Sequence, residues 1–263
     1  MHSCSCWVRL YTHDERDVPV STRHADILTA SAHVMASEQL VKITVDDAHQ
    51  VSGLLQVPDP ARACFVLAHG AGAGMRHPFL AAVAAELADH GIATLRYQFP
   101  YMERGSKRPD SPDTCHATVR AAVTDAAART PAAPLFAGGK SFGGRMTSQA
   151  QANDPLPAVR GLVFLGFPLH PPGQPSESRA QHLVGIQVPM LFLQGTRDDF
   201  AKLDLIEPVV ARLADRAELK LFRDADHSFH VPARSGRTDA EVRGDLTRTL
   251  ATWIDAVIGH AAG

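Results

Sequence analysis

From Val41 onward, short apolar runs typical of strands alternate with longer stretches in which the apolar positions have a helical pattern. The strand-like runs cover residues 41–47, 51–58, 64–70, 93–100, 134–139, 161–169, 188–195 and 218–225. The helical patterns cover residues 78–91, 114–129, 142–153, 201–214 and 238–258. This alternation predicts an α/β fold, with a mostly parallel, doubly wound sheet that is flanked by helices on both faces and opens with an antiparallel pair.

The N-terminal segment lacks this pattern. Residues 1–38 show no sustained period of 2 or 3.6, so we expect a disordered extension there. A start of translation at Met35 is the alternative, in which case the recorded start is misassigned. Residues 39–263 are predicted to form one domain, because no repeat or low-complexity segment interrupts them.

Composition narrows the choice of partners and compartment. A chain of 263 residues with 45% hydrophobic content can bury one large core, and a formal net charge of −2 gives no field that would gather nucleic acid or a membrane. We therefore expect a small-molecule substrate, while the oligomeric state is not predicted. The 14 histidines are scattered without a metal-ligand spacing, so no metal or other cofactor is expected. Few cysteines, no long apolar run and no secretory leader favour the cytoplasm. The cysteines are Cys4, Cys6, Cys64 and Cys115.

The stretch LFAGGKSFGGRM (135–146) joins a predicted strand to a predicted helix. Its Gly-Lys-Ser would end a phosphate-binding loop only if residue 134 were glycine, and that residue is Pro134. Residues 139–143 instead match G-x-S-x-G, in which a serine is held in a tight strand-to-helix turn between glycines that avoid collisions. Ser141 is therefore a candidate nucleophile.

Candidate acids and bases follow two later strands directly. Asp198 and Asp199 come after residues 188–195, and His227 and His230 come after residues 218–225. Because parallel strands end at one edge of the sheet, these side chains are expected beside Ser141. Their order along the chain, Ser-Asp-His, is that of α/β-hydrolases, where histidine takes the serine proton and a carboxylate orients the imidazole. Spacing favours Asp198 over Asp199 and His227 over His230.

A glycine-rich loop at residues 69–74 offers backbone donors for an oxyanion. One donor should be the N–H of Phe142, which follows the nucleophile, and the second is Ala71, with Gly72 as the next choice. The loop is spaced G-x-G-x-G and so lacks the dinucleotide fingerprint. His69 is expected to brace this loop rather than to take part in catalysis.

Basic and aromatic residues beside the same strand ends are candidate contacts for an anionic or polar acyl group. The alternative for the basic residues after the fourth predicted strand is a solvated loop whose charge is balanced by Glu103 and Asp110. The alternative for Lys140, beside the nucleophile, is an ion pair with a neighbouring acid. The candidate substrate contacts are Gly72, Arg96, Tyr101 and Lys140.

Six motifs together resemble a known family: LAHGAGAGM, LRYQFPYMERG, AGGKSFGGRM, GFPLHPPGQP, LFLQGTRD and DADHSF. They resemble the lid-less α/β hydrolases related to dienelactone hydrolase. More narrowly, they resemble the predicted hydrolases that share their domain with the third subunit of the nonspecific-lethal histone acetyltransferase complex. The resemblance covers residues 41–258 and implies the α/β-hydrolase fold, a triad of Ser141, Asp198 and His227, and the Ala71 and Phe142 amides as oxyanion donors.

Only about eighteen residues separate Leu169 from Val188, which is too few for a helical lid domain. An open site favours small esters, thioesters or lactones over long-chain lipids. The leading hypothesis is thus a serine esterase or thioesterase that works through an acyl-enzyme. The alternative is a non-catalytic interaction subunit on the same fold, because some relatives work as assembly subunits.

Overall fold

The computed structural model describes residues 37–260. Nearly all of the predicted extension, Cys4, Cys6 and Met35 included, lies outside the described residues. The first strand begins at Glu38, three residues before the apolar pattern becomes clear at Val41. Within the described part of the chain, no helix is both long and apolar enough to cross a lipid bilayer.

Eight strands form one sheet in the order β1-β2-β4-β3-β5-β6-β7-β8. β2 runs antiparallel to both of its neighbours, and the pairs from β4 to β8 are parallel, which confirms the predicted sheet. The strands are β1 (Glu38–Thr44), β2 (Gln50–Gln56), β3 (Ala63–Ala68), β4 (Ile92–Tyr97), β5 (Leu135–Lys140), β6 (Val159–Leu165), β7 (Met190–Gly195) and β8 (Ala217–Phe222).

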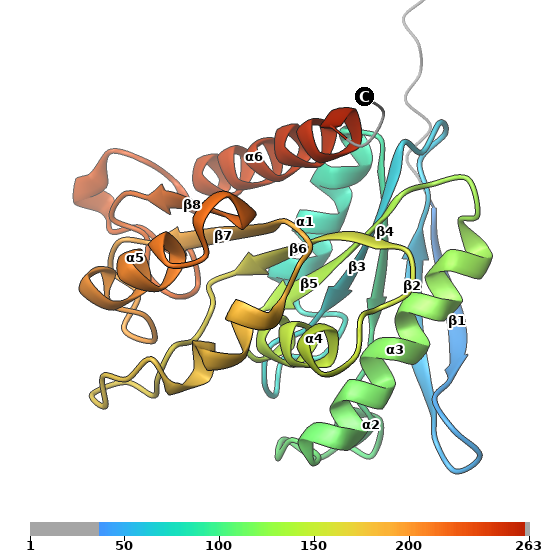
Figure 1. Cartoon of the computed structure of the whole chain (residues 1–263). Helices are drawn as coiled ribbons and strands as arrows, with labels where there is room; N and C mark the ends of the chain where they lie inside the picture. The colour runs from blue at the N-terminus through green and yellow to red at the C-terminus, as the bar shows by residue number, and fades with distance from the viewer. Residues whose placement is uncertain (1–36, 261–263) are drawn as a thin grey trace, which may run out of the picture. The chain divides into compact units, whose positions relative to one another are not determined.

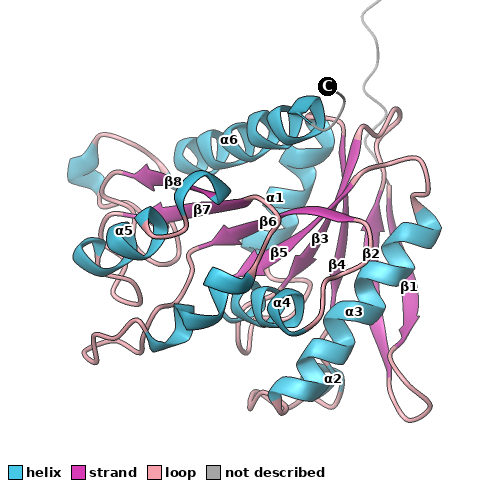
Figure 2. Ribbon diagram, in the orientation of Figure 1, coloured by secondary structure: helices cyan, strands magenta, loops and turns pink. Residues whose placement is uncertain are grey.

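Helices cover both faces of the sheet, as Figures 1 and 2 show. Alternate residues of β3 show how the two layers form: Cys64 and Val66 pack in the core beneath α3, α4 and α5, whereas Phe65 and Leu67 pack against α1 and α6. The α-helices are α1 (Pro78–Asp89), α2 (Pro100–Glu103), α3 (Pro112–Arg129), α4 (Phe142–Asn153), α5 (Leu203–Ala211) and α6 (Asp239–His260). Three 3₁₀ helices are η1 (Ser178–Gly185), η2 (Ala214–Arg216) and η3 (Ala233–Ser235).

The structure differs from the predicted elements mainly at loops. The expected loop after β4 contains the short helix α2, which begins at a proline suited to the first helical turn. The helix expected from residue 201 begins at Leu203, because the Ala201 N–H bonds to the Asp198 carbonyl and keeps residues 198–201 in a turn. Element ends depend on such tertiary contacts, which local pattern does not contain.

The segment that would hold a lid is short, and its one helix contacts α4. Between the end of β6 and the start of β7, η1 is the only helix in residues 166–189. The predicted absence of a lid domain is confirmed, and the carboxyl ends of β5, β7 and β8 open on the same side of the domain.

Candidate active site

Ser141 occupies a sharp turn between β5 and α4. Its φ of +50° is unusual for a residue with a side chain, and its N–H bonds to the Leu165 carbonyl at 3.2 Å. The turn presses the chain against β3. A Cβ at Gly139 would lie 2.5 Å from the Ala68 carbonyl oxygen, and one at Gly143 would lie 2.6 Å from that of His69. Both glycines of the motif are therefore required by close backbone approach.

His227 lies in the loop after β8 and bonds on both sides of its ring. Its Nε2 is 2.8 Å from the Ser141 Oγ, and its Nδ1 is 2.7 Å from the Asp198 Oδ2. These partners assign the proton to Nδ1, which donates to the carboxylate, and leave Nε2 to accept from the serine hydroxyl. The ring of Phe200 packs over the imidazole at 4.2 Å between centroids. A hydroxyl placed in this way can pass its proton to the imidazole.

Asp198 follows β7 and is only 3% exposed. Its Oδ1 accepts the Phe200 N–H at 2.8 Å, and its Oδ2 accepts from the Gln194 side-chain amide as well as from His227. A carboxylate with this many donors is fixed in one orientation. The neighbouring Asp199 is exposed, so the structure brings Asp198 and not Asp199 to the imidazole.

Two other histidines lie outside this constellation. His230 is exposed and pairs with Asp239 at 2.9 Å, and this pairing raises its pKa. His182 lies 2.8 Å from the Oγ of Ser148, a second serine–histidine contact. Ser148 is buried inside helix α4, and no carboxylate contacts His182 among the described residues, so this pair lacks both the strained turn and the acid.

The environment keeps the imidazole neutral near pH 7. Burial lowers the pKa of His227 below the ordinary histidine value, the hydrogen bond to Asp198 opposes this, and the charge of Lys140 adds to the lowering. A neutral imidazole is the form that can accept a proton. The site is therefore poised for base chemistry at neutral pH.

Two backbone N–H groups beside Ser141 are free to bind an anion. Within the described part of the chain, neither the Ala71 N–H nor the Phe142 N–H has a hydrogen-bond acceptor. The loop of residues 69–72 lies against the serine, since a Cβ at Gly70 would be 3.9 Å from the Ser141 Cβ. His69 braces this loop: its Nδ1 bonds to the Gly70 carbonyl at 2.8 Å and its Nε2 accepts the Phe99 N–H.

The structure corrects the expectation for three of the candidate substrate contacts. The Gly72 N–H donates to the Tyr101 hydroxyl at 3.2 Å, and Tyr101 is buried, so this pair holds the loop in shape. Arg96 is 1% exposed, pairs with Glu38 and donates to the Met75 carbonyl at 3.3 Å. The side chains of Arg96 on β4 and Tyr101 on α2 point into the protein, where they stabilise the fold and are not placed to contact a substrate.

Lys140 also differs from the expectation. Its ammonium nitrogen is buried beside Gly166 and the ring of Phe229, behind the histidine. Successive side chains of β5 alternate between faces, so Lys140 points to the layer of α1 and α6, together with Phe136. A buried ammonium in this layer is not placed to contact a bound acyl group.

Sequence reasoning missed two residues of the site. The side-chain amide of Gln194 donates a hydrogen bond to Asp198, and its side-chain oxygen accepts the Phe167 N–H at 2.9 Å. Gln194 thereby links the ends of β6 and β7. A polar residue within the apolar run of β7 was the available signal. Phe200, which packs on the imidazole, had no distinguishing pattern.

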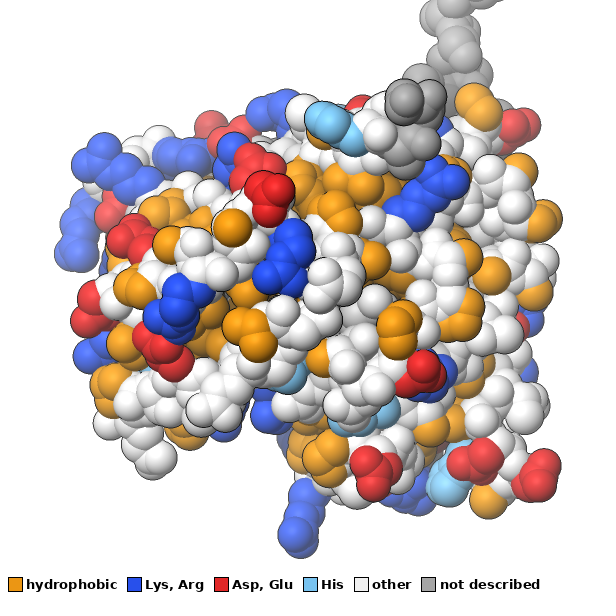
Figure 3. Space-filling view, viewed as in Figure 1, with side chains coloured by type: hydrophobic (Ala, Val, Ile, Leu, Met, Phe, Trp, Pro, Cys, Tyr) orange, Lys and Arg blue, Asp and Glu red, His pale blue; other side chains and the backbone are white. Residues whose placement is uncertain are grey.

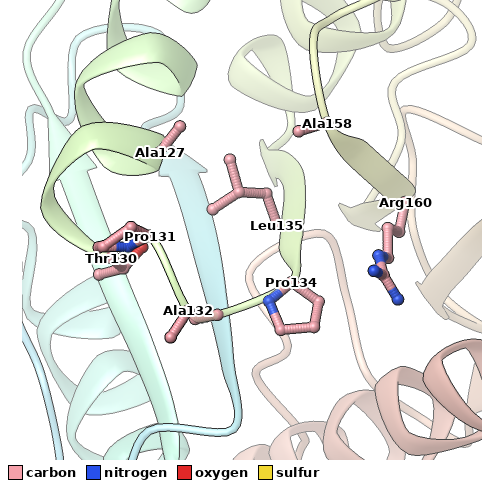
Figure 4. A pocket seen from close by; sticks show the side chains of 9 residues that line it. Ala127, Thr130, Pro131, Ala132, Pro134, Leu135, Ala158 and Arg160 are labelled. Atoms are coloured by element: carbon pink, nitrogen blue, oxygen red, sulfur yellow. The ribbon is translucent and has the colours of Figure 1, made fainter.

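A separate pocket in the described part of the chain has mainly apolar walls. This pocket of about 240 Å³ lies between the end of α3, the loop of residues 130–134 and the start of β6 (Figure 4). It is at the opposite end of the strands from Ser141, and its walls are apolar apart from Thr130 and Arg160. On the face in Figure 3, acidic and basic side chains are interspersed.

Comparison with known proteins places this geometry in a family. Residues 61–255 match the family model described as alpha/beta hydrolase domain. Dienelactone hydrolase from Anabaena variabilis is similar in structure, with a TM-score of 0.68 at 20% identity over 84% of this chain and 98% of that one. A serine hydrolase without a lid from Xanthomonas campestris gives 0.64 at 20% identity over 82% and 94%. Est1E from Butyrivibrio proteoclasticus gives 0.62 at 15% identity over 84% and 99%. These structures share the fold, and the family model covers most of the chain. The chain therefore belongs to the alpha/beta hydrolase domain family.

Proposed function

We propose that this hydrolase cleaves small carboxylic esters or thioesters, lactones included, through an acyl-enzyme formed on Ser141. The observation that carries the proposal is the continuous hydrogen-bonded chain from Ser141 through His227 to Asp198. Each member has the chemistry that its place requires: a half-buried hydroxyl in a strained turn, a neutral imidazole and a buried, fixed carboxylate.

In the first half-reaction the Ser141 Oγ attacks the acyl carbon while His227 Nε2 takes the hydroxyl proton. The carbonyl π electrons move onto its oxygen, and the N–H groups of Ala71 and Phe142 stabilise the negative charge that forms there. Collapse of this intermediate breaks the bond to the leaving alcohol or thiol, which receives the proton from His227. Asp198 stabilises the imidazolium between these two transfers.

In the second half-reaction a water molecule repeats the sequence. His227 takes a proton from the water as its oxygen attacks the acyl carbon, and the tetrahedral intermediate expels the Ser141 Oγ. The imidazolium returns the proton to that oxygen, so the acid is released and the serine is regenerated. No further reactant is consumed.

The absence of a lid supports a small substrate. Residues 166–189 form only one 3₁₀ helix over this side of the sheet, so no apolar cover is built for a long acyl chain. A non-catalytic subunit would have no need for a buried carboxylate aligned with a histidine and a strained serine. The aligned contacts therefore favour catalysis over the interaction role.

We also place the protein in a reducing compartment, in keeping with the cytoplasm expected from the sequence. Cys64 and Cys115 are free and buried in the core layer of α3. Thiols that persist in this form need no oxidising environment.

The two serine–histidine pairs give a matched test of the nucleophile. S141A should abolish labelling by a fluorophosphonate probe and lower turnover of p-nitrophenyl acetate by about 10³-fold or more, because the attacking oxygen is removed. S148A should retain both, since Ser148 serves helix packing. Loss of labelling in S148A with retention in S141A would assign the nucleophile to the other pair.

The adjacent aspartates test the acid. D198N should lower kcat for p-nitrophenyl acetate by about 10³ to 10⁴-fold, because an amide cannot stabilise the imidazolium and favours the wrong tautomer. D199N should stay within about twofold of the wild type, since its side chain is exposed. Steady-state kinetics of the two variants measure this, and equal losses in both would contradict the assignment.

The pH dependence follows from the lowered pKa of His227. The imidazole must be neutral to accept the serine proton, so kcat/KM falls as the pH drops through this pKa. Because burial lowers the pKa of His227, kcat/KM for p-nitrophenyl acetate should reach half of its maximum at a pH below the ordinary histidine value of about 6.5. A midpoint clearly above that value would contradict the environment described for His227.

A further inference from the structure

Lys140 places a buried ammonium beside the candidate catalytic histidine. It is the last residue of β5 and directly precedes Ser141. Its Nζ is buried and has no hydrogen-bond or ion-pair partner among the residues that the structure describes. By contrast, the guanidinium of Arg96, which is also buried, pairs with Glu38.

Gly166 shows how near this ammonium is to the imidazole. A Cβ at Gly166 would lie 3.1 Å from the Lys140 Nζ and 3.3 Å from the His227 Nδ1. The two nitrogens are therefore separated by less than the sum of these distances. The φ of Gly166 is +71°, so a glycine at the end of β6 leaves the space that both side chains share.

An aromatic ring from the loop of residues 223–232, called the histidine loop because it carries His227, contacts the ammonium. The Nζ lies 5.7 Å from the centroid of the Phe229 ring, within the range of a cation–π contact. Phe229 is itself fixed, because it stacks on Phe79 and meets the edge of Phe222. The lysine thus contacts the loop that carries His227, two residues from the histidine.

The charge at this position has no role in packing. Burying an ammonium without a hydrogen-bond or ion-pair partner is unfavourable, and a methionine would fill similar space without that cost. The charged groups that act on Lys140 are Asp198, after β7, and Asp226, in the histidine loop. Those that act on His227 are the same two aspartates and Lys140 itself. The charge therefore affects the Asp198–His227 pair most directly.

Resting on the proposed function, we propose that Lys140 is a positioning residue whose buried positive charge tunes the basicity of His227 and so extends activity toward acidic pH. A nearby ammonium disfavours the imidazolium, so the histidine stays neutral, and able to act as a base, at lower pH. Burial lowers the pKa of Lys140 to about 8, with Asp198 and Asp226 opposing the shift. The lysine is therefore charged throughout the pH range in which His227 titrates.

Two neutral substitutions test this role, K140M as an apolar replacement and K140Q as a polar one. The imidazole of His227 is followed by NMR during a pH titration, with H227Q to assign its signal, and kcat/KM for p-nitrophenyl acetate is measured over the same range. In either variant that folds, the histidine should titrate at higher pH than in the wild type. The ratio of kcat/KM at pH 5.5 to that at pH 8 should fall by about threefold or more, as expected for loss of a unit charge at this range. K220M, which removes an exposed lysine on β8, should leave both unchanged.

An unchanged His227 titration in K140M or K140Q would overturn the proposal. A loss of activity that is equal at all pH values would also overturn it, because a purely structural role predicts that result. The NMR titration does not depend on turnover. If the wild type hydrolysed no ester, the proposed function would fail, whereas the titration would still decide the role of Lys140.

Discussion

The hydrogen bonds on the two sides of the His227 ring are the interaction on which the rest of the site depends. They join groups from three strand ends: Ser141 after β5, Asp198 after β7 and His227 after β8. Each hydrogen bond forms only if the strands that carry its two groups end at matching positions. The parallel sheet meets this condition because the carboxyl ends of its strands lie along one edge. The helices on both faces hold that edge in place, and the missing lid leaves it open.

Fixing these bonds requires unusual local structure. The serine adopts a positive φ, and the two glycines of the motif, on either side of Ser141, permit close backbone approaches that a side chain would prevent. Asp198 is buried and receives donors from Gln194 and Phe200, so the carboxylate is held before any substrate arrives. This preorganisation is what a hydrolase needs, because groups that are already aimed do not have to reorganise during the reaction.

Much of this arrangement could be predicted from the sequence, and the limits have physical reasons. The turn around Ser141, the order of the elements and the strand-end positions of Asp198 and His227 follow from glycine spacing and from where apolar runs stop. The contacts of Arg96, Tyr101 and Lys140 could not be predicted, because a side chain at or shortly after a strand end can face either the site or the core. Only the tertiary partners decide: Glu38 for Arg96, the Gly72 amide for Tyr101, and the aromatic layer under the histidine loop for Lys140.

The proposed reaction depends on a covalent bond between the acyl carbon of the substrate and the oxygen of Ser141. The most direct measurement is mass spectrometry of the protein quenched during turnover of a slowly deacylating ester, such as an aryl carbamate, followed by peptide mapping. The acyl mass is expected on the peptide that contains Ser141. It should appear in step with release of the aryl alcohol and decay as the enzyme recovers. Release of the alcohol without any acyl adduct, or an adduct confined to another residue, would contradict the proposed reaction.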